Sequence, residues 1–300
     1  MKWLELAVEA PPELAEPLSE VFLRYGHGGV AVEEAGGYNP DEGGPAPKPD
    51  RVWVKTYLPF DSEMEEKRSR IDLAVRLISQ VGPVSELIER ALNEEEWGSA
   101  WKQHFRPLRV GERMVVVPTW TTYSPRASDV VINLDPGMAF GTGHHPTTRM
   151  CMELLEDQVA PGMSVLDVGC GSAILSIAAA RLGAAHVVGL DTDATAADVG
   201  AANVGVNGVS GSVRIVHGSL PHADAPVGIF DVAVANISSK VVLELAGELV
   251  GALRPEGLLV VSGFLLDDAD AIAERLSTAG AAVRQRRDEG DWACLLASAV

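Results

Sequence analysis

The fold is decided by the stretch Val165-Leu166-Asp167-Val168-Gly169-Cys170-Gly171-Ser172-Ala173. Its first four residues read as an apolar strand, its glycines as a tight turn, and the residues from 174 to 182 as a helix. Glycines have no Cβ atom, so backbone N–H groups can approach a ligand closely where the helix starts, at the carboxyl end of a strand. The stretch therefore predicts an α/β fold with a ligand site at this turn.

Two nucleotide chemistries compete for the turn. A dinucleotide fingerprint requires the spacing G-x-G-x-x-G, whereas this chain has Gly169 and Gly171 but Ile174 in place of the third glycine. Asp191, at the end of the next strand, is suited to accept both ribose hydroxyls of an adenosyl group. Because either ligand contains that ribose, Asp191 does not decide between them, and capping of the following helix is its alternative role.

From residue 163 onward, short apolar runs alternate with helical stretches. This alternation predicts a parallel sheet covered on both faces, with helices between the first five strands. A final pair of strands without a helix predicts an antiparallel hairpin at the edge. We expect a doubly wound, Rossmann-like, seven-stranded sheet whose strands are residues 164–168, 186–191, 213–217, 230–235, 258–262, 282–286 and 292–297.

The N-terminal part of the chain follows a different pattern. Strand-like runs and two amphipathic helical stretches occur in the order βαββαβ, which predicts a small split-βαβ, ferredoxin-like α+β domain over residues 1–93. Over residues 94–110, Trp97, Trp101 and Phe105 stand four residues apart, which predicts a connector helix with its aromatic face packed against the protein. Residues 111–300 then form the ligand-binding domain.

Residues 135–148, with the sequence DPGMAFGTGHHPTT, are too rich in glycine and turn-forming residues for a core segment. They precede a helix expected over residues 149–155, and Thr147 or Thr148 can cap that helix or bind a ligand. We expect a lid over the site. Adjacent His144 and His145 cannot easily share one metal ion, and no carboxylate stands at ligand spacing, so we expect no metal.

A third candidate is Asn236, at the end of the apolar strand that starts at Phe230. The carboxyl ends of parallel strands meet at one edge of the sheet, so Asn236 should face the same crevice as Gly169. An amide there can accept a hydrogen bond from an amine nucleophile or donate one to a bound cofactor. A turn-forming asparagine is the alternative interpretation.

Composition limits the partners of the chain. The 24 basic and 42 acidic residues give a net charge of −18, which opposes binding to a phosphate backbone and would suit a basic protein partner. An acidic surface that only maintains solubility is the alternative interpretation. Three widely spaced cysteines, Cys151, Cys170 and Cys294, predict neither a disulfide framework nor a zinc site. With no signal-like or membrane-spanning segment in the sequence, we expect a cytoplasmic protein.

These motifs closely resemble those of the PrmA family, which methylates amino groups of the large-subunit ribosomal protein L11. The resemblance covers nearly the whole chain, and the segment at residues 135–148 is its most specific signature; the aromatic connector and Trp292 also match the family. It implies a class I methyltransferase that uses S-adenosylmethionine, with the N-terminal domain recognising L11. The cofactor contacts that it implies are Thr148, Gly169, Asp191 and Asn236, with Phe140, Gly141 and Gly171 beside them.

The expected reaction is attack of a neutral lysine ε-amine or N-terminal α-amine on the methyl group, with Asn236 as the catalytic orienting residue. Two departures from the family pattern concern Ala173, where a third glycine is usual, and Ser238-Ser239. A lysine methyltransferase of another protein and a non-catalytic cofactor-binding assembly factor are the alternatives. Adenine and glutamine methyltransferases fit poorly, because Ile237 and Ser238 stand where they carry prolines.

Overall fold

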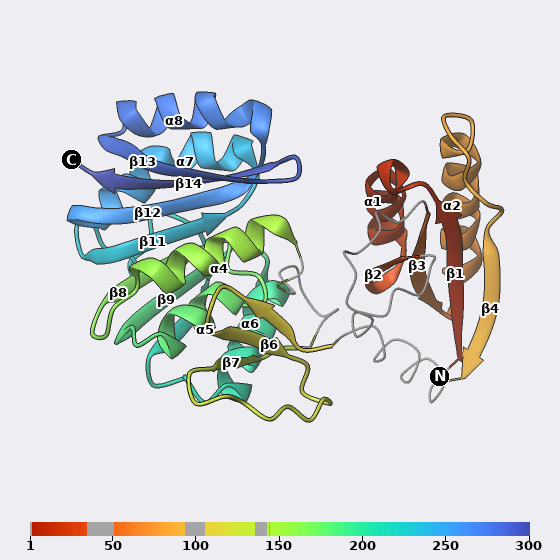
Figure 1. The fold of residues 1–300 in the computed structure, drawn as a ribbon, viewed down its shortest axis with the longest axis horizontal. Helices are drawn as coiled ribbons and strands as arrows, with labels where there is room; N and C mark the ends of the chain where they lie inside the picture. The colour runs from red at the N-terminus through yellow and green to blue at the C-terminus, as the bar shows by residue number, and fades with distance from the viewer. Residues whose placement is uncertain (1, 35–50, 94–105, 136–142, 144) are drawn as a thin grey trace. The chain divides into compact units, whose positions relative to one another are not determined.

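The computed structural model describes residues 2–34, 51–93, 106–135, 143 and 145–300. The chain divides into two compact units, Met1–Phe105 and Arg106–Val300, which we describe separately (Figure 1). The connector aromatics at 97, 101 and 105, the lid residues Phe140 and Gly141, and His144 lie outside the described residues. In the part of the chain that is described, no helix is long and apolar enough to cross a membrane.

The N-terminal unit is a four-stranded antiparallel sheet with two helices. Its strand order is β2-β3-β1-β4, and the elements follow one another as the sequence predicts, in the order βαββαβ. Alternate residues of β1, such as Leu4, Leu6 and Val8, are buried against Phe22 and Ile71 from the two helices. The elements are β1 (Lys2–Ala10), η1 (Pro12–Leu14), α1 (Ala15–Tyr25), β2 (His27–Glu34), β3 (Val52–Pro59), α2 (Met64–Ile78) and β4 (Ile88–Asn93).

The C-terminal unit is built on a seven-stranded sheet with the order β10-β9-β8-β11-β12-β14-β13. The first five strands in this order are parallel and β14 and β13 are antiparallel, which confirms the edge hairpin. Its strands are β8 (Ser164–Val168), β9 (His186–Asp191), β10 (Val213–His217), β11 (Phe230–Asn236), β12 (Leu253–Leu265), β13 (Ala281–Glu289) and β14 (Trp292–Ala299).

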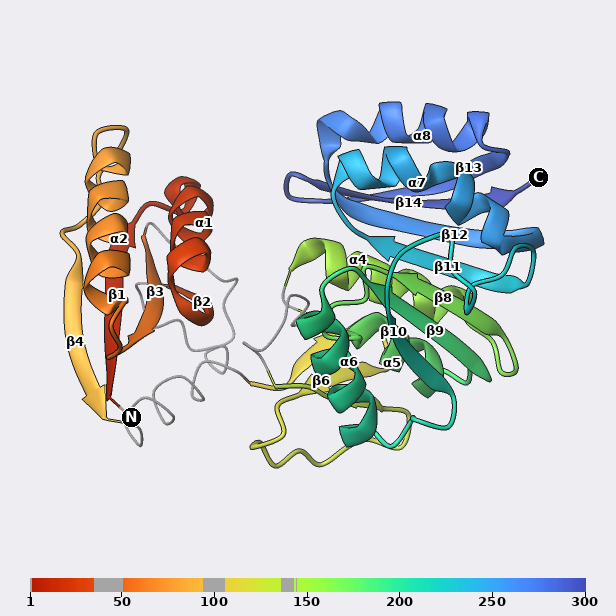
Figure 2. The same ribbon diagram turned by 180° about the vertical axis from the view of Figure 1, so that it is seen from behind.

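Helices cover both faces of this sheet (Figures 1 and 2). One buried cluster joins the sheet to α4 (Pro146–Gln158), α5 (Ile174–Arg181) and α6 (Ala194–Val206). A second cluster joins the other face to α7 (Ser239–Ala252) and α8 (Ala269–Thr278), which follows the short η3 (Leu266–Asp268). Burial of these apolar side chains is the main favourable contribution to the fold.

The expectation of helices between all of the first five strands is wrong at one place. Residues 218–229 connect β10 to β11 without a helix. This segment contains Pro221, Pro226 and Gly228, and proline removes a backbone donor and clashes within a helix. It carries the chain from the edge strand β10 past β9 and β8 to β11 in the middle of the sheet.

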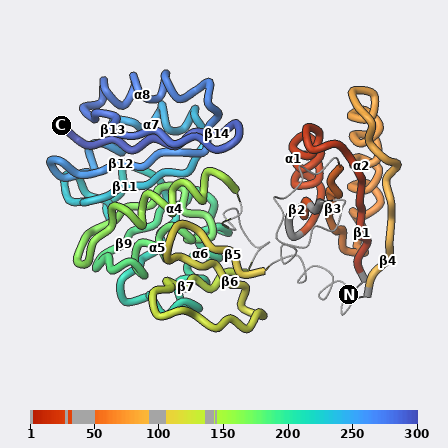
Figure 3. The backbone as a smooth tube through the Cα atoms, in the orientation of Figure 1, coloured from red at the N-terminus to blue at the C-terminus, as the bar shows by residue number. Residues whose placement is uncertain are grey.

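A second, three-stranded sheet lies beside α5, and the sequence did not predict it (Figure 3). It consists of β5 (Leu108–Val110), β6 (Met114–Val117) and β7 (Val130–Asn133). Its buried residues Val116 and Ile132 join the same core as α4 and α5. These strands are three or four residues long and carry little periodicity of their own.

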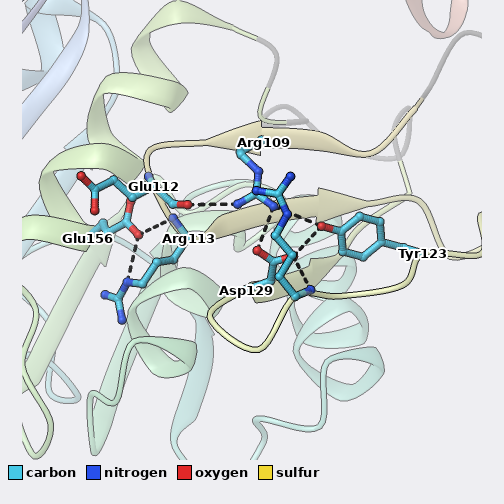
Figure 4. A network of polar contacts seen from close by, with 7 residues as sticks. Arg109, Glu112, Arg113, Tyr123, Asp129 and Glu156 are labelled. Atoms are coloured by element: carbon cyan, nitrogen blue, oxygen red, sulfur yellow. Dashed lines mark hydrogen bonds and ion pairs between the residues drawn. The ribbon is translucent and has the colours of Figure 1, made fainter.

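Polar contacts fasten this small sheet to α4 (Figure 4). The Glu156 carboxylate of α4 accepts the backbone N–H groups of Glu112 and Arg113, at 2.9 and 2.8 Å, in the turn between β5 and β6. Nearby, Tyr123 and Arg109 both donate to the Asp129 carboxylate, at 2.6 and 2.8 Å. The Tyr123 hydroxyl in particular lowers the pKa of Asp129 to about 2. The network holds the helix that carries Thr148.

Candidate active site

A cavity of about 660 Å³ opens at the carboxyl ends of β8, β9 and β11. From β8 the chain runs outward through β9 to β10 and then returns to β11 on the other side of β8, so this is the topological switch point of the sheet. Ligands of open α/β sheets bind at such points. The structure brings five of the residues expected at the site to this cavity: Thr148, Gly169, Gly171, Asp191 and Asn236.

The loop after β8 is held by hydrogen bonds from its own amides. The N–H groups of Gly169 and Cys170 donate to the Leu190 carbonyl at 2.8 and 3.0 Å. Gly169 has φ 73°, and a Cβ atom there would collide with the side chain of Ile237. A side chain at position 169 is therefore excluded both by the backbone conformation and by the loop after β11.

Asp191 ties this loop to the end of β9. Its Oδ2 accepts the N–H of Gly171 at 2.8 Å, and its Oδ1 accepts the N–H of Asp193 at 3.0 Å. The cap of α6 is Asp193, which accepts from Thr195, so helix capping does not account for Asp191. Each carboxylate oxygen has a second lone pair for a further donor at the cavity.

Ala173 adopts a left-handed conformation, with φ 63° and ψ 22°, at the N-cap of α5. This conformation costs a residue with a Cβ atom about 1–2 kcal/mol. The methyl group is fully buried and faces Gly200 of α6, where an added Cβ would lie 3.3 Å from it and 2.9 Å from the Gly171 carbonyl oxygen. Alanine fits at this position because residue 200 has no side chain.

Asp167 lies behind the loop and is fully buried. The Ser176 hydroxyl donates to its Oδ2 at 2.6 Å, whereas its Oδ1 has no hydrogen-bond partner among the described residues. Burial raises the pKa of Asp167 to about 7, assisted by the charge of Asp191 and opposed by the hydrogen bonds from Ser176. The hydrogen bond from Ser176 thus joins the end of β8 to α5 behind the glycine loop.

Asn236 has a buried side-chain oxygen that accepts no hydrogen bond from the described residues. Its Nδ2 donates to the Oγ1 of Thr148 at 3.2 Å, and Thr148 is itself buried in α4. The Oδ1 of Asn236 is buried and has no partner within the described ranges. A buried acceptor without a donor costs about 1–3 kcal/mol, so this oxygen provides a position where a ligand N–H would be stabilised.

The helix that carries Thr148 begins at Pro146, earlier than the sequence indicates, and His145 is its N-cap. The Nδ1 of His145 accepts the backbone N–H of Thr147 at 3.4 Å and lies 2.7 Å from the Thr147 hydroxyl. Its ring meets that of Trp292 edge-on, with centroids 4.6 Å apart. Both His145 and Trp292 line the cavity.

Comparison with known proteins places the chain in a family. Residues 2–299 match the model of the family described as ribosomal protein L11 methyltransferase (PrmA). The chain belongs to this family. It is 43% identical to the ribosomal protein L11 methyltransferase of Chloroflexus aurantiacus, covering 98% of this chain and 97% of the relative. It is 41% identical to that of Pelotomaculum thermopropionicum, covering 99% of each.

A solved structure supports the same conclusion. The ribosomal protein L11 methylase of Lactobacillus delbrueckii subsp. bulgaricus is 29% identical, with a TM-score of 0.58. The match covers 65% of this chain and 98% of that structure. The predicted PrmA resemblance is confirmed, and the chain is an enzyme of the methyltransferase class.

Some PrmA cavity residues were not assigned to the site from the sequence. Gly263 of β12 lines the cavity, and with φ 94° it leaves room for the backbone of Ile237. Trp292, noted only for its resemblance to a family tryptophan, also lines it. Both stand in strands distant in sequence from the glycine loop, and only the sheet order places them there. A glycine inside an apolar strand is the signal that points to Gly263.

Proposed function

We propose that this PrmA protein transfers methyl groups from S-adenosylmethionine to amino groups of ribosomal protein L11, namely lysine ε-amines and the N-terminal α-amine. The observation that carries the proposal is the buried, unpartnered Oδ1 of Asn236 in the described part of the cavity. An amine presents N–H donors, and this oxygen is an acceptor. A carbonyl or phosphate acceptor in the same position would leave the oxygen unsatisfied.

The cavity fits the cofactor in size and chemistry. Its volume of about 660 Å³ lies within the usual range for small-molecule sites, about 300–1,000 Å³. Asp191 would accept the ribose hydroxyls, and the loop at Gly169 and Gly171 would allow the ligand to approach the backbone closely. Thr148 and Asn236 would lie near the methyl group that is transferred. When bound, S-adenosylmethionine supplies a methyl group already activated by a sulfonium.

The protein then has to orient a neutral amine. Asn236 Oδ1 accepts one N–H, which fixes the nitrogen lone pair, while Thr148 holds the amide through its other end. One C–N bond forms as one C–S bond breaks, and the amine proton passes to solvent. Alignment of this kind lowers the barrier without a covalent enzyme intermediate. The amine must be unprotonated, so the rate should rise with pH below the amine pKa.

Two observations support L11 as the substrate. The relatives with 41–43% identity over nearly their whole length are named for it. The net charge of −18 suits a basic protein partner. We assign recognition of the substrate to the N-terminal unit, cofactor binding to the C-terminal unit, and the reaction to the cytoplasm.

The test is transfer of a labelled methyl group from S-adenosylmethionine to purified L11, followed by mass spectrometry of the peptides. L11 with all amines acetylated is the matched control and should take no label. Label on L11 amines supports the proposal in full. Label only on another ribosomal protein would replace the substrate, and cofactor binding without label on any protein would identify a non-catalytic binder.

A further inference from the structure

The first turn of α4 begins with an unusual cap. N-cap positions favour serine, threonine, aspartate and asparagine, yet here His145 occupies that position, followed by Pro146. Its Nδ1 lies 2.7 Å from the Thr147 hydroxyl and accepts the Thr147 N–H. An imidazole in this role brings a ring to the cavity wall, which a shorter capping side chain does not.

The ring of His145 connects this turn to the β13–β14 hairpin. It meets Trp292 at 4.6 Å with an interplanar angle of 72°, the edge-to-face arrangement that aromatic pairs prefer. One turn further along the helix, Arg149 forms an ion pair with Glu289 of β13. The start of α4 is thus held by the hairpin at two successive points.

The same turn carries Thr148, whose Oγ1 accepts the Nδ2 of Asn236 at 3.2 Å. We infer that His145 is a positioning residue: by capping α4 and packing on Trp292, it holds Thr148 against the amide of Asn236. With its Nδ2 bonded to Thr148, the Asn236 side chain keeps its Oδ1 available to the substrate amine. This inference rests on the proposed function, because it assigns a purpose to the orientation of Asn236.

The cap requires an unprotonated Nδ1, because only then can this nitrogen accept. Burial and the nearby Arg149 lower the pKa of His145, and Glu289 opposes them by raising it. Arg149 of α4 and Glu289 of β13 are the charged groups that act on the ring, and Trp292 of β14 carries no charge. The lowered pKa favours the neutral ring at pH 7. At a pH low enough to protonate the ring, Nδ1 can no longer accept and the cap is lost.

The experiment measures binding of S-adenosylhomocysteine to the full chain by calorimetry between pH 5 and 8. His145→Ala should weaken binding about fivefold at pH 7.5, because the free energy lost with a helix N-cap corresponds to about that change in an equilibrium constant. His145→Asn keeps a capping oxygen but no ring and should lose less. As the pH falls and His145 becomes protonated, wild-type affinity should decline toward that of His145→Ala, whereas the His145→Asn variant should lack this decline. Asp167 titrates in every variant, so the difference between wild type and His145→Asn isolates residue 145.

Turnover separates positioning from general stability. His145→Ala should lower kcat for L11 methylation at least fivefold with little change in KM for L11. Ile272→Val, on the buried face of α8 in the cluster on the other side of the sheet from α4, should lower the melting temperature without changing kcat or affinity. Wild-type affinity and kcat in His145→Ala, or an acid decline that persists in His145→Asn, would overturn the inference. Failure of the wild-type chain to bind S-adenosylhomocysteine would instead overturn the proposed function on which the inference rests.

Discussion

The neighbouring strands β8 and β11 end in different polar environments. Each contributes a buried side-chain oxygen that has no hydrogen-bond partner within the described structure, Asp167 Oδ1 and Asn236 Oδ1. Asp167 lies behind a loop whose amides are satisfied by Leu190 and Asp191. Asn236 lies in the wall of the cavity, with only its NH₂ group engaged.

The difference lies in what can satisfy each oxygen. A buried carboxyl group takes up a proton, and the pKa of Asp167 near 7 reflects this. A carboxamide cannot do so, and its oxygen is satisfied only by a hydrogen-bond donor, which the described residues do not supply. The end of β8 is therefore satisfied within the protein, whereas under the proposed function the substrate amine supplies the donor for the end of β11.

The largest effect is expected for Asp167→Asn, measured as a change in the pH dependence of stability. In the folded chain Asp167 keeps its proton to about pH 7, whereas in the unfolded chain it loses it near pH 4. The folded state binds more protons in this window, so stability falls as the pH rises from about 4 to 7. The shift of roughly three pKa units corresponds to about 4 kcal/mol at most.

Asparagine does not titrate, so the Asp167→Asn variant should lack this decline. Thermal unfolding of both proteins at pH 4.5 and pH 8 tests the prediction, because groups that do not interact with Asp167 contribute equally to the two proteins. Parallel curves for wild type and variant would show that the buried carboxyl is ionised in the folded state.

At the β11 end, Asn236→Ala should lower kcat for L11 methylation about 100-fold, the scale of a misplaced nucleophile. Asn236→Asp keeps an acceptor oxygen and should retain more activity than the alanine variant. Asn207→Ala is a control for loss of a buried amide, because Asn207 bonds to Asn133 away from the cavity. It should reduce stability and leave kcat of the folded enzyme unchanged. Equal kcat values for Asn236→Ala and wild type would remove the orienting role.

A smaller effect is expected for the packing of α6 against the loop that follows β8. In Gly200→Ala the new Cβ would meet the Gly171 carbonyl oxygen and the Ala173 methyl group, so we expect a loss of about 1–3 kcal/mol and weaker binding of S-adenosylhomocysteine. Adding Ala173→Gly should restore part of the stability, measured by a double-mutant cycle in urea. Gly205→Ala on the same helix has nothing within 4 Å and should stabilise by about 0.5–1 kcal/mol. Additive effects at 173 and 200 would contradict the packing argument.

The smallest effect concerns the surface ion pairs of α4. Arg287 of β13 pairs with Glu153 and Asp157 at 2.9 and 2.7 Å. These pairs are partly exposed, so Arg287→Ala should cost less than about 1 kcal/mol, and the loss should shrink at high salt. Arg286→Ala, which removes pairs to Asp288 and Asp270 rather than to α4, is the matched control. A loss of several kcal/mol for Arg287→Ala would show that these pairs, rather than buried contacts, fix α4.

The elements with strong local patterns could be predicted from the sequence. The apolar run into Gly169 and Gly171 placed β8 and α5, and the final pair of strands without a helix gave the hairpin. Thr148, Asp191 and Asn236 were brought to one site because strand ends converge in a parallel sheet. These conclusions need only periodicity and one topological rule.

What could not be predicted depends on contacts between distant segments. The strands β5, β6 and β7 are too short to show a period, and pairing with one another and burial against α5 stabilise them. The helix expected between β10 and β11 is absent because Pro221 and Pro226 outweigh the alternating pattern. The cap by His145 depends on Trp292, which is 147 positions later in the sequence and adjacent only after folding.

The contact between Ala173 and Gly200 has a consequence for how this chain can diverge. The methyl group of Ala173 lies 3.3 Å from where a Cβ atom at residue 200 would stand, so side chains at the two positions crowd each other. Among relatives, a side chain at 200 should therefore occur more often beside glycine than beside alanine at 173.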